Sequence, residues 1–249
     1  MLESRLLNRA RSNPSKHFGP RISMKNQLGV HVVFACLLLS LTINVSSRGD
    51  QPASVADATS EDGFVTLFDG QSLDGWTGAV DGYEVVDGAI QCKAKHGGNL
   101  YTKEVYGDFV VRLEFQLPPR GNNGLAIRFP GKGDPAYVGM CELQVLDNTH
   151  PDYANLDDRQ FHGSAYGMAA AKRGALKPVG QWNEQEVTVI GSTIRVVLNG
   201  QEILNTDLSK IDEYLADRPH PGKDRVEGHF GFAGHGDAVK FRNVRIKSL

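Results

Sequence analysis

The chain has 249 residues, a formal net charge of -2, 22% charged residues and 40% hydrophobic residues, which is typical of a soluble globular protein and not of a disordered or fibrous one. The near-neutral balance and the lack of a basic stripe with interleaved aromatic residues give no electrostatic footprint for nucleic acid, so we expect no nucleic-acid partner. The 28 glycines and the low helical periodicity predict many short strands joined by turns.

The first 61 residues differ in composition from the rest of the chain. A basic stretch leads through Met24 to an almost entirely apolar run at 28–43, which small residues follow. These are the three parts of a secretory signal peptide, so 1–47 is predicted to be an N-terminal extension and signal peptide, with Met24 as a candidate true start. A retained membrane anchor is the alternative, because the run is close to the shortest that spans a bilayer. The polar segment 48–61 is predicted to be a linker.

We therefore expect an exported protein, periplasmic or extracellular, that meets a membrane only through the signal peptide or a retained N-terminal anchor. Residues 62–249 are a usual length for one domain with a hydrophobic core. They contain Cys92 and Cys141, which an oxidising compartment would allow to form a disulfide. Cys141 fits a core-facing strand position, and we predict that both cysteines are unpaired.

Short alternating segments between turn residues predict some twelve strands. The clearest is 108–117, where five apolar residues alternate with mostly polar ones and indicate a long, half-buried antiparallel strand. The predicted strands are 63–68, 83–86, 89–92, 99–103, 108–117, 124–129, 139–147, 185–190, 193–198, 201–204, 229–233 and 239–247.

Two local signals refine the last third of the chain. Asn199-Gly200 is typical of the two-residue turn of a β-hairpin. Within 239–247 the apolar residues change parity, which predicts a β-bulge near Arg242 and Asn243.

One short helix is predicted at 207–218. Three apolar residues recur there at helical spacing behind Asp207, a candidate N-cap. Many short strands with one helix predict an all-β sandwich or jelly roll.

Two strands that follow each other in the chain carry polar side chains on one face. In 139–147, Glu142 and Gln144 point away from the apolar residues, and in 124–129 the same holds for Arg128. A guanidinium and a carboxylate are therefore expected to meet on one sheet face, in a bidentate geometry suited to a polar ligand. The solvated face of an edge strand is the alternative interpretation.

Residues 148–182 lose regular patterning and are rich in Gly, Ala, His and Asp. A loop of this length in a compact domain is usually functional or disordered. His162 lies in this loop, and His235 lies in a later Gly-His-Gly-Asp turn. Each histidine is either a site residue or an ordinary loop residue, and the glycines beside His235 also suit a turn.

An ordered set of short motifs comprises 63–70 with 73–76, 108–109, 139–140 before 142–147, 162–163 with 166–167, 178–183, 198–200, and 235–237 before 239–243. As a set they resemble the 3-keto-disaccharide hydrolase domain, a family also described through 3-keto-glucoside lyase and 3-keto-glucal hydratase activities. The resemblance covers essentially all of 62–249. It implies a concanavalin A-like lectin/glucanase jelly roll of two antiparallel sheets, an exported bacterial protein and a small keto-sugar substrate.

The implied chemistry assigns roles to several residues. A ketone at C3 acidifies the proton at C2, so a base can remove that proton, the C1 substituent can leave, and water can add to the resulting enone. Glu142 or His162 is the candidate base, and Arg128 or a bound divalent cation is the candidate stabiliser of the enolate oxygen. The substrate-binding candidates are Gln144, Asp147, Tyr166 and His235.

Other interpretations stay open at this point. Glu142-x-Gln144-x-x-Asp147 is similar to the carboxylate motif of laminarinase-like glycosidases, although its middle acid is Gln and its last is the shorter Asp. A metal bound by His162, Glu142 or Asp147 is compatible with ligand chemistry, but no close His or Cys spacing favours it. Direct hydrolysis could replace elimination, and a carbohydrate-binding module without catalysis could use the same polar face.

Overall fold

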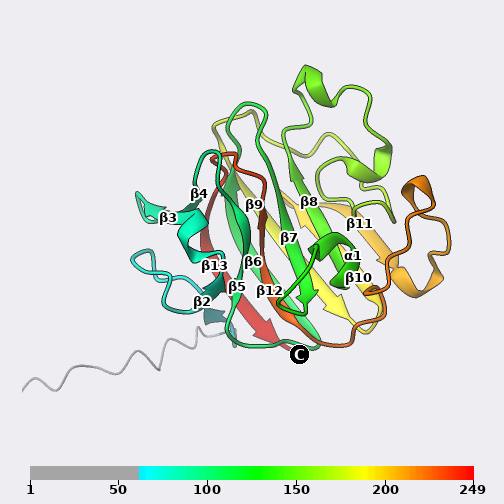
Figure 1. Cartoon of the computed structure of the whole chain (residues 1–249), viewed down its shortest axis with the longest axis horizontal. Coiled ribbons are helices and arrows are strands. Elements are labelled where there is room, and N and C mark those ends of the chain that lie inside the picture. Colours follow the sequence, from blue (N-terminus) through cyan, green and yellow to red (C-terminus); the bar gives the residue numbers. More distant parts are fainter. Residues whose placement is uncertain (1–61) are drawn as a thin grey trace, which may run out of the picture. The chain divides into compact units, whose positions relative to one another are not determined.

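Two antiparallel β-sheets packed face to face form the domain (Figure 1). The computed structural model describes residues 62–249; the predicted signal peptide and linker lie outside the described residues. The larger sheet contains β1 (Val65–Thr66), β3 (Tyr83–Val86), β4 (Ala89–Cys92), β6 (Phe109–Gln116), β9 (Trp182–Ile190), β10 (Thr193–Leu198), β11 (Gln201–Asp207) and β13 (Lys240–Ser248). The smaller sheet contains β2 (Trp76–Gly78), β5 (Gly98–Thr102), β7 (Asn122–Phe129), β8 (Cys141–Leu146) and β12 (His229–Gly234).

Hairpins such as β3–β4, β7–β8 and β9–β10 stay within one sheet, whereas other strands that follow each other in sequence lie in different sheets. The larger sheet runs β11-β10-β9-β6-β13-β4-β3, with β1 paired to β13, and the smaller runs β2-β5-β12-β7-β8. The chain therefore crosses between sheets several times, as in a jelly roll. This arrangement confirms the predicted concanavalin A-like sandwich. Within residues 62–249, no helix is long and apolar enough to cross a membrane.

The hydrophobic core lies between the sheets. Along β6, Phe109, Val111, Leu113 and Phe115 are buried while the residues that alternate with them are partly exposed, which confirms the alternation predicted for this strand. Phe232 of the smaller sheet stacks on Phe241 of the larger, with ring centroids 4.0 Å apart. Aromatic contacts of this kind join the two layers.

The two predicted local features of the C-terminal third are present. Asn199 and Gly200 both have positive φ angles, 50° and 80°, which a tight hairpin turn of this kind requires. In β13 the pairing register shifts between Arg242 and Arg245, and Asn243 has a φ of 52°. The β-bulge predicted near Arg242 and Asn243 is therefore confirmed.

The helix predicted at 207–218 is wrong in position. Asp207 caps a single 3-10 turn by accepting a hydrogen bond from the Ser209 amide, but the chain leaves helical geometry at Ala216, where φ is 53°. Within residues 62–249 the α-helical element is α1 (Pro135–Val138), which begins after the N-cap Asp134. The 3-10 turns are η1 (Val80–Gly82), η2 (Pro151–Tyr153), η3 (Asp158–Gln160), η4 (Leu208–Lys210) and η5 (Leu215–Asp217).

Both cysteines of the domain, Cys92 and Cys141, are buried and free, as predicted. Burial raises the pKa of each thiol above its ordinary value. Protonated and enclosed, the two side chains act as small apolar residues of the core.

The long loop after β8 packs along the free edge of that strand. The Gly163 amide donates to the Gln144 carbonyl (2.8 Å), the Gln144 amide to the Ser164 carbonyl (3.0 Å), and the Tyr166 amide to the Glu142 carbonyl (2.9 Å). These bonds satisfy an edge that would otherwise be open to another strand. They also place the loop beside the polar side chains of β8.

Candidate active site

A polar cavity of about 200 Å³ lies over the outer face of the smaller sheet. Its floor is formed by β7 and β8, and its walls come from α1, the loop after β8, the turn after β12 and the segment at η5. The lining residues are Asn122, Asp134, Ala136, Tyr137, Glu142, Gln144, Tyr166, Arg218 and His235. Four of the predicted site residues, Glu142, Gln144, Tyr166 and His235, are therefore brought together.

Glu142 forms the acidic centre of this cavity. Glu142 on β8 pairs in register with Ala126 on β7. The Glu142 side chain lies over Gly124, which precedes Ala126 by two residues on β7. A Cβ added at Gly124 would overlap the Glu142 carboxylate. Glycine at position 124 therefore provides the space that lets the carboxylate lie against the sheet, with only 6% of the side chain exposed.

His235 is the ionisable partner of Glu142. The Nε2 atom of His235 lies 3.8 Å from Oε1 of Glu142, an ion-pair distance that is longer than a direct hydrogen bond. The His235 side chain is 49% exposed. One member of the pair is thus enclosed, and the other stands where solvent or a ligand can reach it.

Burial and pairing shift both members of this pair. Burial raises the pKa of the Glu142 carboxyl, although the nearby His235 opposes that shift. The Glu142 carboxylate raises the pKa of His235, and burial opposes it. A carboxyl and an imidazole whose pKa values are both raised in this way are suited to proton transfer.

Neutral polar groups surround the pair. Gln144 donates from Nε2 to Oδ1 of Asn122 (2.8 Å), which fixes its amide beside Glu142. The Tyr166 hydroxyl accepts a hydrogen bond from Nε2 of Gln160 (3.0 Å). Amides and a hydroxyl at fixed positions can read the hydroxyl groups of a sugar.

Five lining residues were not among the predicted site residues: Asn122, Asp134, Ala136, Tyr137 and Arg218. The Arg218 guanidinium carbon lies 3.3 Å from the centre of the Tyr137 ring. Asp134 precedes α1 and accepts a hydrogen bond from the Ala136 amide (3.1 Å). Asp134 followed by Pro135 is a sequence signal for the start of a helix, so the position of α1 could have been predicted. No signal in the local sequence predicts that Arg218 lines the cavity.

Arg128 does not meet Glu142, and this prediction is wrong. The Arg128 side chain is 1% exposed, and its guanidinium donates to Asp108 Oδ1 (2.8 Å) and to the carbonyls of Gly107 (2.9 Å), Gly191 (2.7 Å) and Arg225 (2.8 Å). The cause is a register shift between β7 and β12, where Arg128 takes a φ of 47°. The bulge turns the side chain away from the cavity, and Arg128 instead joins loops at one end of the sandwich.

His162 also lies outside the cavity. Its ring is stacked on Phe115 of the core (4.9 Å between centroids), Nδ1 accepts from the Leu146 amide (3.4 Å), and Nε2 lies 3.0 Å from Oε1 of Gln185. These partners place the ring proton on Nε2. Burial lowers the pKa of His162 to about 4. A neutral, enclosed imidazole of this kind supports the interior, so the structure does not place His162 as a base beside Glu142.

Asp147 belongs to a turn and not to the cavity lining. Its Oδ2 accepts from the Arg120 amide (2.9 Å), and its Oδ1 accepts from the amide (3.0 Å) and the hydroxyl (2.6 Å) of Thr149. These bonds lower the pKa of the Asp147 carboxyl despite partial burial. The structure therefore does not place Asp147, a candidate substrate-binding residue, in the cavity.

The residues proposed for a metal do not form a donor set. His162 faces the core, Asp147 is held in its turn, and Glu142 faces His235. Within residues 62–249, no group of three or more His, Cys, Asp and Glu side chains is arranged to hold a metal ion. The divalent cation considered from the sequence thus does not fit these three residues.

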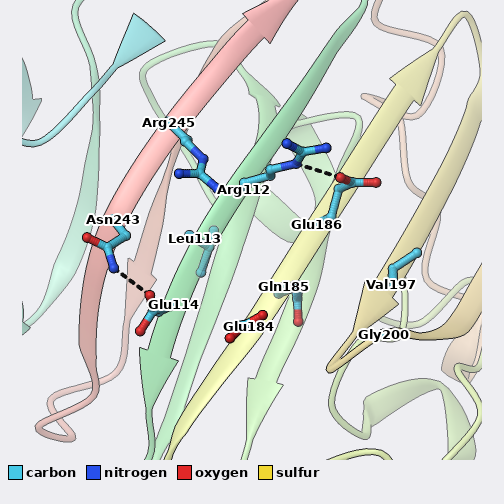
Figure 2. Close-up of a pocket in the computed structure, with 10 residues that line it drawn as sticks. All are labelled: Arg112, Leu113, Glu114, Glu184, Gln185, Glu186, Val197, Gly200, Asn243 and Arg245. Atoms are coloured by element: carbon cyan, nitrogen blue, oxygen red, sulfur yellow. Dashed lines mark hydrogen bonds and ion pairs between the residues drawn. The ribbon is translucent and has the colours of Figure 1, made fainter. Parts of the chain in front are cut away.

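A larger hollow of about 420 Å³ lies over the outer face of the other sheet (Figure 2). Here Arg112 Nε meets Glu186 Oε2 at 2.7 Å, and Glu114 accepts from Asn243 and, at 2.7 Å, from Arg242 Nη2. The side chains of Arg112 and Glu186 are 39% and 28% exposed. Figure 2 shows the Arg112–Glu186 and Asn243–Glu114 pairs spread across β13, β6 and β9, so much of the charge in this hollow is already paired.

Fold and cavity together define a concanavalin A-like β-sandwich with an acid–base pair on the outer face of one sheet. The chain belongs to the 3-keto-alpha-glucoside-1,2-lyase-like domain family, whose model matches residues 63–247.

A curated relative supports this placement. The 3-keto-disaccharide hydrolase of Bacteroides thetaiotaomicron is 30% identical over 230 residues, which cover 76% of this chain and 79% of that protein.

Solved structures agree on the fold. A crystal structure from Parabacteroides distasonis, provisionally described as a glycosyl hydrolase, has a TM-score of 0.67 and 25% identity and covers 75% of this chain and 99% of that one. A second structure from the same organism, described in the same way, has a TM-score of 0.67 and 24% identity and covers 79% of this chain and 98% of that one.

Proposed function

We propose that this protein is an enzyme that cleaves 3-keto-glycosides, with Glu142 and His235 as its acid–base pair. The observation that carries the proposal is the enclosed Glu142 carboxylate beside His235 in a polar cavity. The name of the Bacteroides relative supports the substrate class.

Glu142 is the base in this proposal. It takes the proton from C2 of the keto sugar, and the electron pair of the C–H bond moves to the C3 oxygen to give an enolate. Because burial raises the pKa of the Glu142 carboxyl, its carboxylate form is a stronger base than an ordinary glutamate.

His235 is the matching acid. When the enolate collapses, the bond between C1 and the leaving oxygen breaks, and the imidazolium of His235 gives its proton to that oxygen. Water then adds to C1 of the enone and gives a proton to the neutral His235, which restores the imidazolium. Glu142, whose proton exchanges with solvent while the enone is bound, protonates C2. Direct attack of water at C1 could use the same pair, so the isotopic experiment below separates the two routes.

Sugar recognition falls to the neutral residues of the cavity. Gln144, Asn122 and Tyr166 offer donors and acceptors that can match sugar hydroxyls. Neither tryptophan of the domain lines the cavity: Trp76 stacks on Phe232 at 5.2 Å, and Trp182 packs under Arg242 at 4.0 Å. This argues against the alternative of a binding module built on an exposed tryptophan platform.

The test is incubation of the purified protein with a 3-keto-glucoside in deuterated water, with the unoxidised glucoside as control. We expect cleavage of the keto sugar alone, with deuterium at C2 of the released 3-keto-glucose. Cleavage without deuterium would favour direct hydrolysis if a substrate that carries deuterium at C2 is cleaved at the same rate, because return of the abstracted proton would still show an isotope effect. Binding of either sugar without cleavage would favour the non-catalytic module.

Export is part of the proposal and rests on the composition of residues 1–47. We expect the mature protein to be periplasmic or extracellular. N-terminal sequencing of secreted material should find a start near Ser47, whereas a mature chain that still contains 28–43 would show a retained anchor.

A further inference from the structure

We infer that Arg218 is a catalytic residue that stabilises the negative charge on the C3 oxygen when Glu142 removes the C2 proton. This inference rests on the proposed function. It assigns to Arg218 the role that the sequence suggested for Arg128.

Arg218 is the arginine that shares the cavity with the proposed base. Both Arg218 and Glu142 line it, whereas Arg128 does not. Within residues 62–249, no carboxylate lies within ion-pair distance of the Arg218 guanidinium, in contrast to Arg112 or Arg173. A guanidinium without a carboxylate partner in a cavity is available to an oxyanion of a ligand.

The guanidinium is held by α1. Its stacking on Tyr137, at 3.3 Å from the ring centre, restricts the end of an otherwise flexible side chain. Two residues further on, His220 donates from Nδ1 to the Ala136 carbonyl (2.7 Å) and packs between Tyr137 and Tyr214, at 4.8 and 5.2 Å. The segment that carries Arg218 is thus fastened to the cavity wall.

The backbone before Arg218 is strained. Ala216 and Asp217 both have φ angles of 53°, a region that non-glycine residues enter at a cost of roughly 1–2 kcal/mol each. The hydrogen bond from the Leu215 amide to the Gly167 carbonyl (2.8 Å) helps to hold this conformation. Backbone strain concentrates at functional sites, where it fixes a side chain before the ligand arrives.

The chemistry requires a group of this kind. Proton removal from C2 moves an electron pair onto the C3 oxygen, and the charge persists until the C1 bond breaks. A guanidinium fixed in advance stabilises the charged enolate oxygen more strongly than it stabilises the oxygen of the neutral ketone. It therefore lowers the barrier more than it strengthens substrate binding. The proton moves to Glu142, and no oxidant or reductant takes part.

The test compares Arg218→Gln and Arg218→Lys with the unaltered protein, using a neutral 3-keto-glucoside. We expect Arg218→Gln to lower kcat by about 10²–10³-fold with KM changed little, because the charge arises only in the transition state. Arg218→Lys should recover part of kcat. Guanidinium ion added to an Arg218→Ala variant should also restore part of it.

The matched control is Arg173→Gln. Arg173 also stacks on an aromatic ring, 4.4 Å from the centre of Phe161, but it lies outside the cavity and pairs with Asp158. This variant should keep its kcat. Thermal unfolding should show that all variants are folded.

The outcomes separate the two proposals. If the unaltered protein neither cleaves the keto sugar nor exchanges its C2 proton, the proposed function fails. If it does both and Arg218→Gln keeps its kcat, the role of Arg218 alone is overturned. A higher KM at unchanged kcat, for this neutral sugar, would likewise overturn the enolate role and assign Arg218 to ground-state binding.

Discussion

The outer faces of the two sheets differ in whether their charged side chains are exposed or enclosed. On the larger sheet, acids and bases such as Arg112 and Glu186 pair with each other in contact with solvent (Figure 2). On the smaller sheet, loops cover Glu142 and leave it one half-exposed partner, His235. Exposed pairs are worth about 0–1 kcal/mol and have little chemical reactivity, whereas an enclosed carboxyl has a shifted pKa. The smaller hollow is therefore the better candidate for catalysis, although the other has the larger volume.

The largest effect on activity is expected from Glu142→Gln. The amide keeps the volume of the side chain over Gly124 but cannot accept a proton, so kcat/KM should fall by roughly 10³-fold or more. The matched control is Glu186→Gln on the larger sheet. Near-normal turnover of Glu142→Gln on a 3-keto-glucoside would remove Glu142 from the mechanism.

The largest effect on stability is expected from Arg128→Met. It leaves three loop carbonyls without their donor and leaves Asp108 with only the Gly191 amide, so we expect the free energy of unfolding to fall by roughly 3–5 kcal/mol. Urea unfolding measures this change. Activity per folded molecule should persist, and its selective loss in a stably folded variant would restore Arg128 as a site residue.

His235→Gln should lower kcat/KM by about 10²-fold and change its pH profile. In the unaltered protein, activity needs Glu142 deprotonated and His235 protonated, and both pKa values are raised. The acid limb of the activity profile should therefore lie at a higher pH than the pKa of an ordinary glutamate. The alkaline limb should lie at a higher pH than the pKa of an ordinary histidine. The variant should lose the alkaline limb; a profile that keeps this limb would assign it to another group.

The interior His162 should control acid stability and not the activity profile. Its folded pKa of about 4 lies below its ordinary value of 6.5, so its contribution to stability is present above pH 6.5 and is lost as the pH falls through about 4. The loss is on the order of 3 kcal/mol. In His162→Gln, urea unfolding between pH 7 and 4 should show a shallower decline than in the unaltered protein. An equal decline in both proteins would show that His162 is not the titrating group.

The smallest effect is expected on the larger sheet. Glu186→Gln breaks exposed pairs with Arg112 and Arg195, and should change the free energy of unfolding by about 1 kcal/mol or less and leave kcat/KM unchanged. A large loss of activity in this variant would mean that the hollow of Figure 2 takes part in the reaction.

The sequence predicts what depends on local periodicity. The alternation in β6, the turn at Asn199 and Gly200, and the outward direction of Glu142 and Gln144 all follow from a period of two residues or from local turn chemistry.

Other positions depend on tertiary structure. A bulge turns the Arg128 side chain away from the cavity. The sequence of β7 alone does not predict this bulge, because the register shift arises where β7 pairs with β12. His162 lies in a loop without periodicity, so no pattern gives its direction. Arg218 reaches the cavity through left-handed backbone at Ala216 and Asp217. Asp adopts this conformation only occasionally and Ala rarely, so the local sequence does not predict it.

The most direct test of the central claim is the kinetic isotope effect on kcat/KM with a 3-keto-glucoside that carries deuterium at C2. Removal of the C2 proton by Glu142 predicts slower cleavage of the deuterated sugar and loss of its label to water. Equal rates for the two sugars, with the C2 label fully retained in the product, would contradict it.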